Sequence, residues 1–109
     1  RTSDPINGSI SVVDIIPIQT GNSCVAYAEK DGKILVSWTD VFNLNFEMDP
    51  TFVVYIGSDV GFADLLHHFK TRNTDYWLSS ETRLLYVVIT AKYVTGSESI
   101  YRELIKVEN

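Results

Sequence analysis

The stretch that decides the fold class is LLYVVITAKY, residues 84–93, the longest extended segment in the sequence. Successive side chains of a β-strand point to opposite faces. One face of this segment therefore carries Leu85, Val87, Ile89 and Ala91, and the other carries Tyr86, Val88 and Thr90. The uniformly apolar first face predicts a strand that is buried on that side.

The same period of two recurs along most of the chain. It predicts further strands at residues 10–16, 24–28, 33–38, 51–56, 74–78 and 100–107. Within residues 33–38, one face carries Ile34, Val36 and Trp38, and the Asp31-Gly32 pair before it is a turn signal. Residues 59–70 could be helical, but the β-rich context favours a strand there. About seven strands, with turn signals every 8–12 residues, are typical of a two-sheet sandwich.

The composition describes one ordinary globular domain of 109 residues, 45% hydrophobic and 21% charged. Residues 1–8 are interpreted as a linker and residues 9–109 as the domain. The net charge of −5 and the pI of about 4.8 argue against nucleic acid, heparin-like polyanions and anionic membranes as partners. No stretch approaches the roughly 18–20 apolar residues of a membrane span, so direct membrane insertion is not expected.

Few residues suggest catalysis or metal binding. His67 and His68 are adjacent, so on a strand they should point to opposite faces and could not chelate one metal from one side. The sequence has no Gly-x-Ser-x-Gly nucleophile elbow, and no basic neighbour is evident that would activate Cys24. No catalytic residue, metal ligand or cofactor is therefore predicted, and we expect a non-enzymatic protein.

Loop acids raise the question of calcium, which takes six to eight oxygen ligands. Asp49, Asp59 and Asp64 flank the segment 51–56, but no compact acidic motif gathers them, so solvated acids are favoured. Cys24 is the single cysteine of the chain and is either buried or paired with another molecule; burial is favoured because free Cys packs like a small hydrophobe.

Two kinds of surface site are predicted. Asn7-Gly8-Ser9 is an N-glycosylation acceptor pattern, so Asn7 is a possible glycosylation site if the protein is secreted. Tyr86, Tyr93 and Tyr101 lie on the last two predicted strands or in the loop between them. They form a candidate aromatic interaction surface. The alternative is that these tyrosines cover the sheet or a neighbouring domain.

Three segments, 34–38, 52–55 and 85–99, resemble in this order strands of the fibronectin type III domain. The first ends in a core tryptophan, Trp38, and the last carries Ala91 and Gly96-Ser97 where that family has similar residues. The resemblance implies an all-β, seven-stranded, two-sheet antiparallel β-sandwich with an immunoglobulin-like Greek key. One departure is Leu85, because the family has a tyrosine there whose hydroxyl bonds back to the backbone. Either a bulge shifts Tyr86 into that position, or Leu85 fills it.

The resemblance implies a non-catalytic interaction or spacer module of a multidomain adhesion, matrix or membrane-anchored protein, located outside the cell or at its surface. Its expected partner is a protein or a neighbouring domain of the same chain, bound through a sheet face or through the loops at residues 43–50 and 92–99. Two alternatives stay open: a ligand-binding ectodomain of a receptor, and an accessory domain of a secreted carbohydrate-active enzyme. A row of exposed aromatic residues on one flat face would favour the last.

Overall fold

The computed structural model describes residues 15–108, which form a β-structure without an α-helix. The strands are β1 (Ile18–Gln19), β2 (Val25–Ala28), β3 (Lys33–Ser37), β4 (Phe42–Asn43), β5 (Thr51–Gly57), β6 (Leu66–Thr71), β7 (Asp75–Ser79), β8 (Leu84–Lys92) and β9 (Glu98–Glu108). Two short 3-10 turns, Lys30–Gly32 and Phe46–Met48, lie between strands. The prediction of an all-β fold is confirmed.

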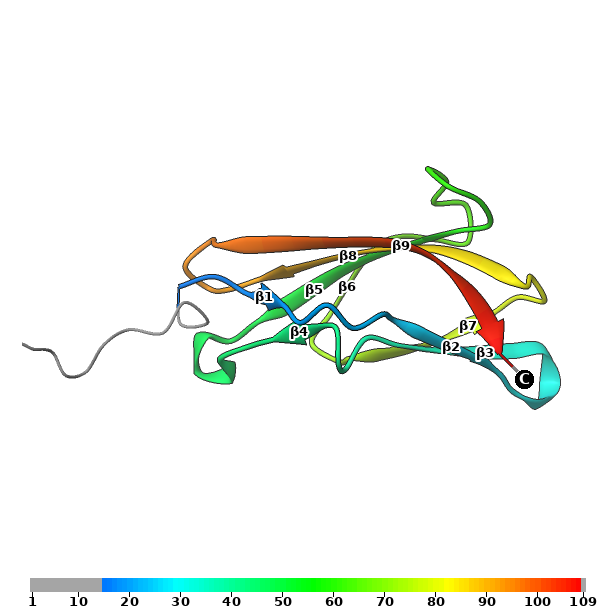
Figure 1. The fold of residues 1–109 in the computed structure, drawn as a ribbon, viewed down its shortest axis with the longest axis horizontal. Coiled ribbons are helices and arrows are strands. Elements are labelled where there is room, and N and C mark those ends of the chain that lie inside the picture. Colours follow the sequence, from blue (N-terminus) through cyan, green and yellow to red (C-terminus); the bar gives the residue numbers. More distant parts are fainter. Residues whose placement is uncertain (1–14, 109) are drawn as a thin grey trace, which may run out of the picture.

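Seven of the strands form one mixed sheet in the order β6-β5-β8-β9-β2-β3-β7, and β1 pairs with β4 in a small second sheet. Every neighbouring pair is antiparallel except β2 and β9, which run parallel through Ala26↔Val107 and Tyr27↔Glu108. This short parallel contact joins the β6-β5-β8-β9 half to the β2-β3-β7 half (Figure 1). The strands thus form a continuous curled sheet, whereas the sequence predicted two separate antiparallel sheets.

The core lies where the apolar faces of both halves meet. Ile34, Val36 and Trp38 are buried, as are Phe52, Val54 and Ile56 of β5 and Leu85, Val87, Ile89 and Ala91 of β8. All of them belong to one hydrophobic cluster, in which the Trp38 and Phe52 rings meet edge to face at 6.0 Å. The core faces inferred from alternation are confirmed for β3 and β8. For β5, whose two faces are both largely apolar, the sequence did not indicate which side would be buried.

The observed positions of the strands and turns agree in most places with those predicted from the sequence. The window 59–70 contains β6 and no helix, and residues 43–50 contain the end of β4 and one 3-10 turn. Asp31 and Gly32 both have φ of 70°, the left-handed conformation that the turn signal predicted between β2 and β3. Residues 10–14 of the first predicted strand, the linker and Asn7 lie outside the described residues.

Leu85 is the residue at which the resemblance to the fibronectin type III domain leads one to expect a tyrosine. The β8–β9 register runs without interruption from Leu84↔Lys106 to Lys92↔Glu98, and the Leu85 side chain is fully buried. No bulge therefore brings Tyr86 into this position, and Leu85 fills it.

Candidate interaction surface

The three predicted surface tyrosines do not lie together on one exposed face. Tyr93 and Tyr101 are only 1% and 6% exposed, whereas Tyr86 is half-buried on the opposite side of the sheet from the core. The expectation that all three form an aromatic contact patch is wrong for Tyr93 and Tyr101. Both belong to the interior, where each hydroxyl meets a backbone amide of a distant segment.

Tyr101 ties β9 to the segment that leads into β2. The Cys24 N–H donates to the Tyr101 hydroxyl at 2.9 Å, and this hydroxyl donates to a carboxylate oxygen of Glu103. The second Glu103 oxygen accepts from Ser23 Oγ at 3.0 Å. Burial raises the pKa of the Tyr101 hydroxyl above its ordinary range, and the hydrogen bond to Glu103 adds to this. The proton therefore stays on the tyrosine, which keeps its role as a donor.

Cys24 lies beside this network and is a buried free thiol, as the sequence predicted. Burial, together with a smaller effect of the nearby Glu103 carboxylate, raises the pKa of its thiol to about 12. A thiol with such a pKa is neutral near pH 7 and is a poor nucleophile. Tyr93 makes a similar tie on the other side of the core, since its hydroxyl accepts from the Asn45 N–H at 2.8 Å.

His67 and His68 lie at an irregularity of β6. Val54 pairs with Phe69 and Ile56 pairs with Leu66, so Tyr55 faces both histidines. His68 has φ of 54°, which is typical of the extra residue in a β-bulge. Both rings consequently contact the Tyr55 ring, with centroids 5.3 and 5.8 Å away. The expectation that the two side chains point to opposite faces is wrong here, because it assumed a regular strand.

The three loop acids each form a hydrogen bond or an ion pair within the chain. Asp49 forms an ion pair with Arg72 at 2.9 Å, and Asp59 accepts from the Val60 N–H. Asp64 accepts from the N–H and the hydroxyl of Ser58, and these hydrogen bonds hold the pKa of its carboxyl below its usual value. Within residues 15–108 no group of three or more His, Cys, Asp or Glu side chains could hold a metal ion.

The outer face of the β6-β5-β8-β9 half, the side away from the core, carries an exposed apolar patch at one end. The loop after β5 folds back over Gly57, so closely that a Cβ there would lie 1.9 Å from the Phe62 carbonyl oxygen. Gly57 pairs with Tyr86, and Tyr86 pairs with Leu104. Phe62 therefore lies over Gly57, next to Tyr86, and Leu104 is one strand further away on β9. Leu84 comes two residues before Tyr86 on the same face of β8.

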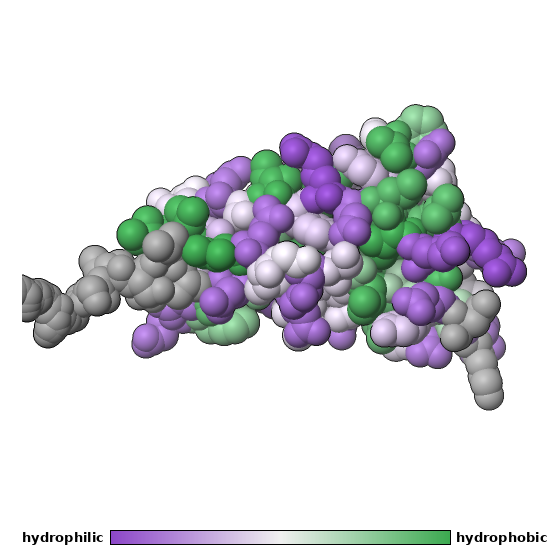
Figure 2. Space-filling model, viewed as in Figure 1, coloured by the Kyte–Doolittle hydropathy of each residue, from purple (hydrophilic) through white to green (hydrophobic). Residues whose placement is uncertain are grey.

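We call Phe62, Leu84, Tyr86 and Leu104 the apolar patch. Apart from half-buried Tyr86, each of its members is at least 40% exposed, and Phe62 reaches 55%. Figure 2 shows apolar side chains gathered at the end of the molecule from which the β5–β6 loop projects. Contiguous exposed apolar surface on a soluble fold is typical of a contact site for another molecule.

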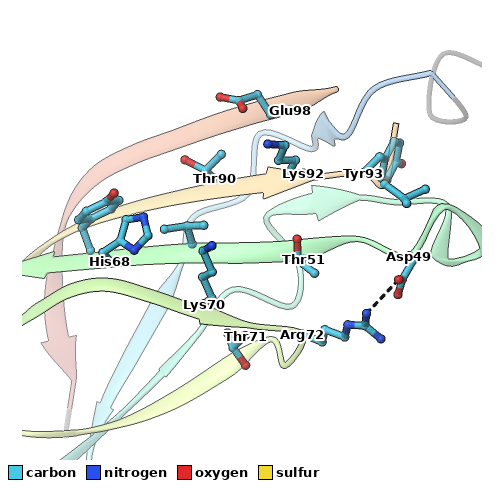
Figure 3. A pocket seen from close by; sticks show the side chains of 13 residues that line it. Asp49, Thr51, His68, Lys70, Thr71, Arg72, Thr90, Lys92, Tyr93 and Glu98 are labelled. Atoms are coloured by element: carbon cyan, nitrogen blue, oxygen red, sulfur yellow. Dashed lines mark hydrogen bonds and ion pairs between the residues drawn. The ribbon is translucent and has the colours of Figure 1, made fainter. Parts of the chain in front are cut away.

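The other end of the outer face is a shallow basic groove of about 830 Å³. Its floor contains Thr51, Val53 and Thr90, and the side chains of Lys70 and Lys92 extend over it from β6 and β8, on the two sides of β5 (Figure 3). The Asp49–Arg72 ion pair lies at one margin and Glu98 at another. The groove thus combines hydroxyls, a small apolar floor and two ammonium groups.

A third exposed feature lies on the outer side of β2, β3 and β7. Tyr27 pairs with Leu35, and Leu35 pairs with Trp77, so the three side chains form one cross-strand row. Tyr27 is 44% exposed and Trp77 is 51% exposed. A depression at the Trp77 end is also lined by Glu29, Asp31 and Lys33. We call Tyr27, Leu35 and Trp77 the aromatic row.

Sequence reasoning missed the apolar patch and the aromatic row. Phe62 lies in a segment without clear periodicity, and its position depends on the fold of the loop over Gly57. Tyr27 and Trp77 come together only through β3, so their neighbourhood is a property of strand order. The β-propensity of residues 24–28 and 74–78 predicted a strand in each segment, but it did not indicate which side of each strand would be exposed.

No protein-family model, curated protein sequence or solved structure matches the chain at a significant level. No helix in residues 15–108 is long and apolar enough to span a membrane. The features of the chain that indicate a function are therefore those of its two outer faces.

Proposed function

We propose that the chain is a non-catalytic protein-interaction module of the fibronectin type III kind, belonging to a larger extracellular or membrane-anchored protein. The strand order supports this class, because β2-β3-β7 and β6-β5-β8-β9 are the two halves expected of such a sandwich. The shared core cluster between the halves supports it as well. The short parallel contact through β2 and β9 is then a local junction between two facing layers.

The observation that carries the interaction function is the apolar patch. Protein interfaces commonly have an apolar and aromatic centre surrounded by polar residues. Phe62, Tyr86 and Leu104 supply such a centre, and Arg102 and Lys106 are outward neighbours on β9. A partner that covers the patch would remove this apolar surface from water, which stabilises the complex by about 25 cal/mol per Å² before the costs of association.

A second candidate function is carbohydrate binding by an accessory domain, and the aromatic row favours it. The Cα atoms of Trp77 and Tyr27 lie two strand spacings apart, about 10 Å. Two flat exposed rings at this separation could stack against successive sugar rings, and Glu29 and Asp31 could accept hydrogen bonds from sugar hydroxyls. This surface is on the other half of the fold from the apolar patch, so the two functions can be tested separately.

A paired binding screen tests both candidates. The chain is applied to a panel of purified extracellular proteins and to an array of neutral glycans, together with the variants Phe62→Ser and Trp77→Ala. Both side chains are more than half exposed, so neither change should unfold the domain. A protein ligand that loses affinity with Phe62→Ser and keeps it with Trp77→Ala supports the interaction module. Glycan binding that Trp77→Ala abolishes supports the second candidate instead.

The predicted glycosylation of Asn7 has its own test. In a secretory expression host, glycosidase treatment should increase the electrophoretic mobility of the secreted chain, and Asn7→Gln should remove this change. A chain that is secreted and folded but carries no glycan at Asn7 would contradict the predicted modification without affecting the binding proposal.

A further inference from the structure

The basic groove stands out because the chain as a whole is acidic. The net charge of the protein is −5, yet the outward positions of β6, β5, β8 and β9 carry Lys70, Lys92, Arg102 and Lys106 against two acids, Glu98 and Glu108. None of these four cations forms a hydrogen bond or ion pair within the described residues. Cations therefore outnumber acids on this face of an acidic protein, although one of the acids, Glu98, lies directly opposite Lys92 on β9.

The groove also has a defined geometry. Lys70 pairs with Val53 on one side of β5, and Lys92 pairs with Thr51 on the other side. The Cα atoms of Lys70 and Lys92 are therefore offset by two strand spacings across the sheet and by two residues along it, which gives a separation of about 12 Å. Val53 lies between them, and the hydroxyls of Thr51 and Thr90 line the same floor (Figure 3). The pattern is cation, small apolar contact, cation.

An extended peptide presents the matching pattern. Alternate residues of an extended chain point to one side, and residues four apart are about 13 Å from each other. A peptide with two carboxylates at this spacing and an apolar residue midway would set each carboxylate near one lysine and the apolar side chain over Val53. Opposite charge would attract such a ligand and align it in the groove.

A dense polyanion fits this surface less well than such a peptide. The groove is bounded by Asp49, already paired with Arg72, and by Glu98. An evenly charged chain that continued past these margins would meet acidic residues and a protein of net charge −5. A short ligand with two charges and apolar contacts avoids this repulsion.

We propose that the basic groove binds an extended acidic peptide segment of a protein partner, with Lys70 and Lys92 as its two carboxylate contacts. This inference rests on the proposed interaction function and names the class of partner. It places the acidic segment on the same outer face as the apolar patch but at the opposite end, so that one partner could span both.

The test uses the synthetic peptide Thr-Glu-Thr-Val-Thr-Glu-Thr, and a matched peptide with glutamine in place of both glutamates. Binding to the isotopically labelled chain is followed by two-dimensional NMR at about 50 and 150 mM salt. The proposal expects chemical-shift changes at Val53, Lys70, Thr90 and Lys92 with the acidic peptide, weaker binding at higher salt, and little response to the glutamine peptide.

Variants then assign the contacts. Lys70→Gln and Lys92→Gln should each weaken binding about two- to fivefold, and the double variant about tenfold. Lys33→Gln, which makes the same charge change on exposed β3, is the matched control and should leave binding unchanged.

Several results would overturn the proposal. Equal binding of the glutamine peptide, or equal weakening by Lys33→Gln, would show that the two groove lysines are not the contacts. Stronger binding of a sulfated oligosaccharide at the same residues would assign the groove to a polyanion. The same shift changes on concentrating the chain alone would assign it to a second copy. If the peptide fails while Phe62→Ser still abolishes binding of a protein ligand, the interaction module stands and only the acidic-peptide assignment falls.

Discussion

The hydroxyl of Tyr101 should be worth far more to stability than an ordinary tyrosine hydroxyl. Tyr101→Phe removes the acceptor of the buried Cys24 N–H and the donor to the Glu103 carboxylate. A buried amide left without a partner costs about 1–3 kcal/mol, and the ring itself still fills its place. We therefore expect the free energy of unfolding to fall by about 2 kcal/mol and the melting temperature by at least about 8 °C.

Urea denaturation followed by tryptophan fluorescence measures this effect, since Trp38 is buried in the native core and becomes exposed on unfolding. The slope of the free energy against urea should not change, because the same surface is exposed in both proteins. Tyr86→Phe is the matched control. Its hydroxyl makes no hydrogen bond within the described residues, so its removal should change stability by less than about 0.5 kcal/mol. If Tyr101→Phe and Tyr86→Phe differ by less than about 0.5 kcal/mol, the tie between β9 and Cys24 has no energetic role and the reasoning is refuted.

Three further changes test other features of the fold. Because burial raises the Cys24 pKa from 9.0 to about 12, the contribution of the protonated thiol to stability is full below pH 9 and is lost as pH rises towards 12. Relative to Cys24→Ala, the free energy of unfolding of the wild type should therefore fall by about 1.4 kcal/mol between pH 8 and pH 10 in urea titrations. Parallel pH dependences of the two proteins would contradict this. Gly57→Ala should destabilise the domain by about 2–4 kcal/mol and displace the β5–β6 loop, because the new methyl group would collide with the Phe62 carbonyl; unchanged amide shifts in that loop would argue against the close approach. Since His68 has positive φ and His67 does not, His68→Gly should cost at least about 1 kcal/mol less than His67→Gly in thermal unfolding, and an equal cost would rule out strain at the bulge.

The sequence was sufficient for the strands whose two faces differ clearly. In β3 and β8 one face is continuously apolar, and Ile34, Val36 and Leu85 are buried as alternation requires. In β9 both faces contain apolar residues: Ile100 and Leu104 point outward, while Tyr101 and Ile105 point inward. Alternation alone could not decide between these faces, and the buried position of Tyr101 was missed for that reason.

Other features depend on contacts that no local pattern encodes. The bulge at His67 and His68 results from the pairing of β6 with β5, and the curled sheet results from the pairing of β2 with β9. The apolar patch requires the loop after β5 to fold over Gly57. The basic groove joins cations from separate strands, which are scattered in the sequence and adjacent only in the sheet. Prediction of these sites needed strand order and register.

The short contact between β2 and β9 has a consequence for biosynthesis. Ala26 and Val107 pair with each other although most of the chain separates them in sequence. The β2–β3, β5–β6 and β8–β9 hairpins, by contrast, each pair strands that are consecutive in the sequence. During translation these hairpins can form as they emerge from the ribosome, but the two halves cannot be joined until β9 has left the exit tunnel. Until then the apolar faces of β3 and β5 lack their final cover, which is the period when binding by a chaperone would protect them most.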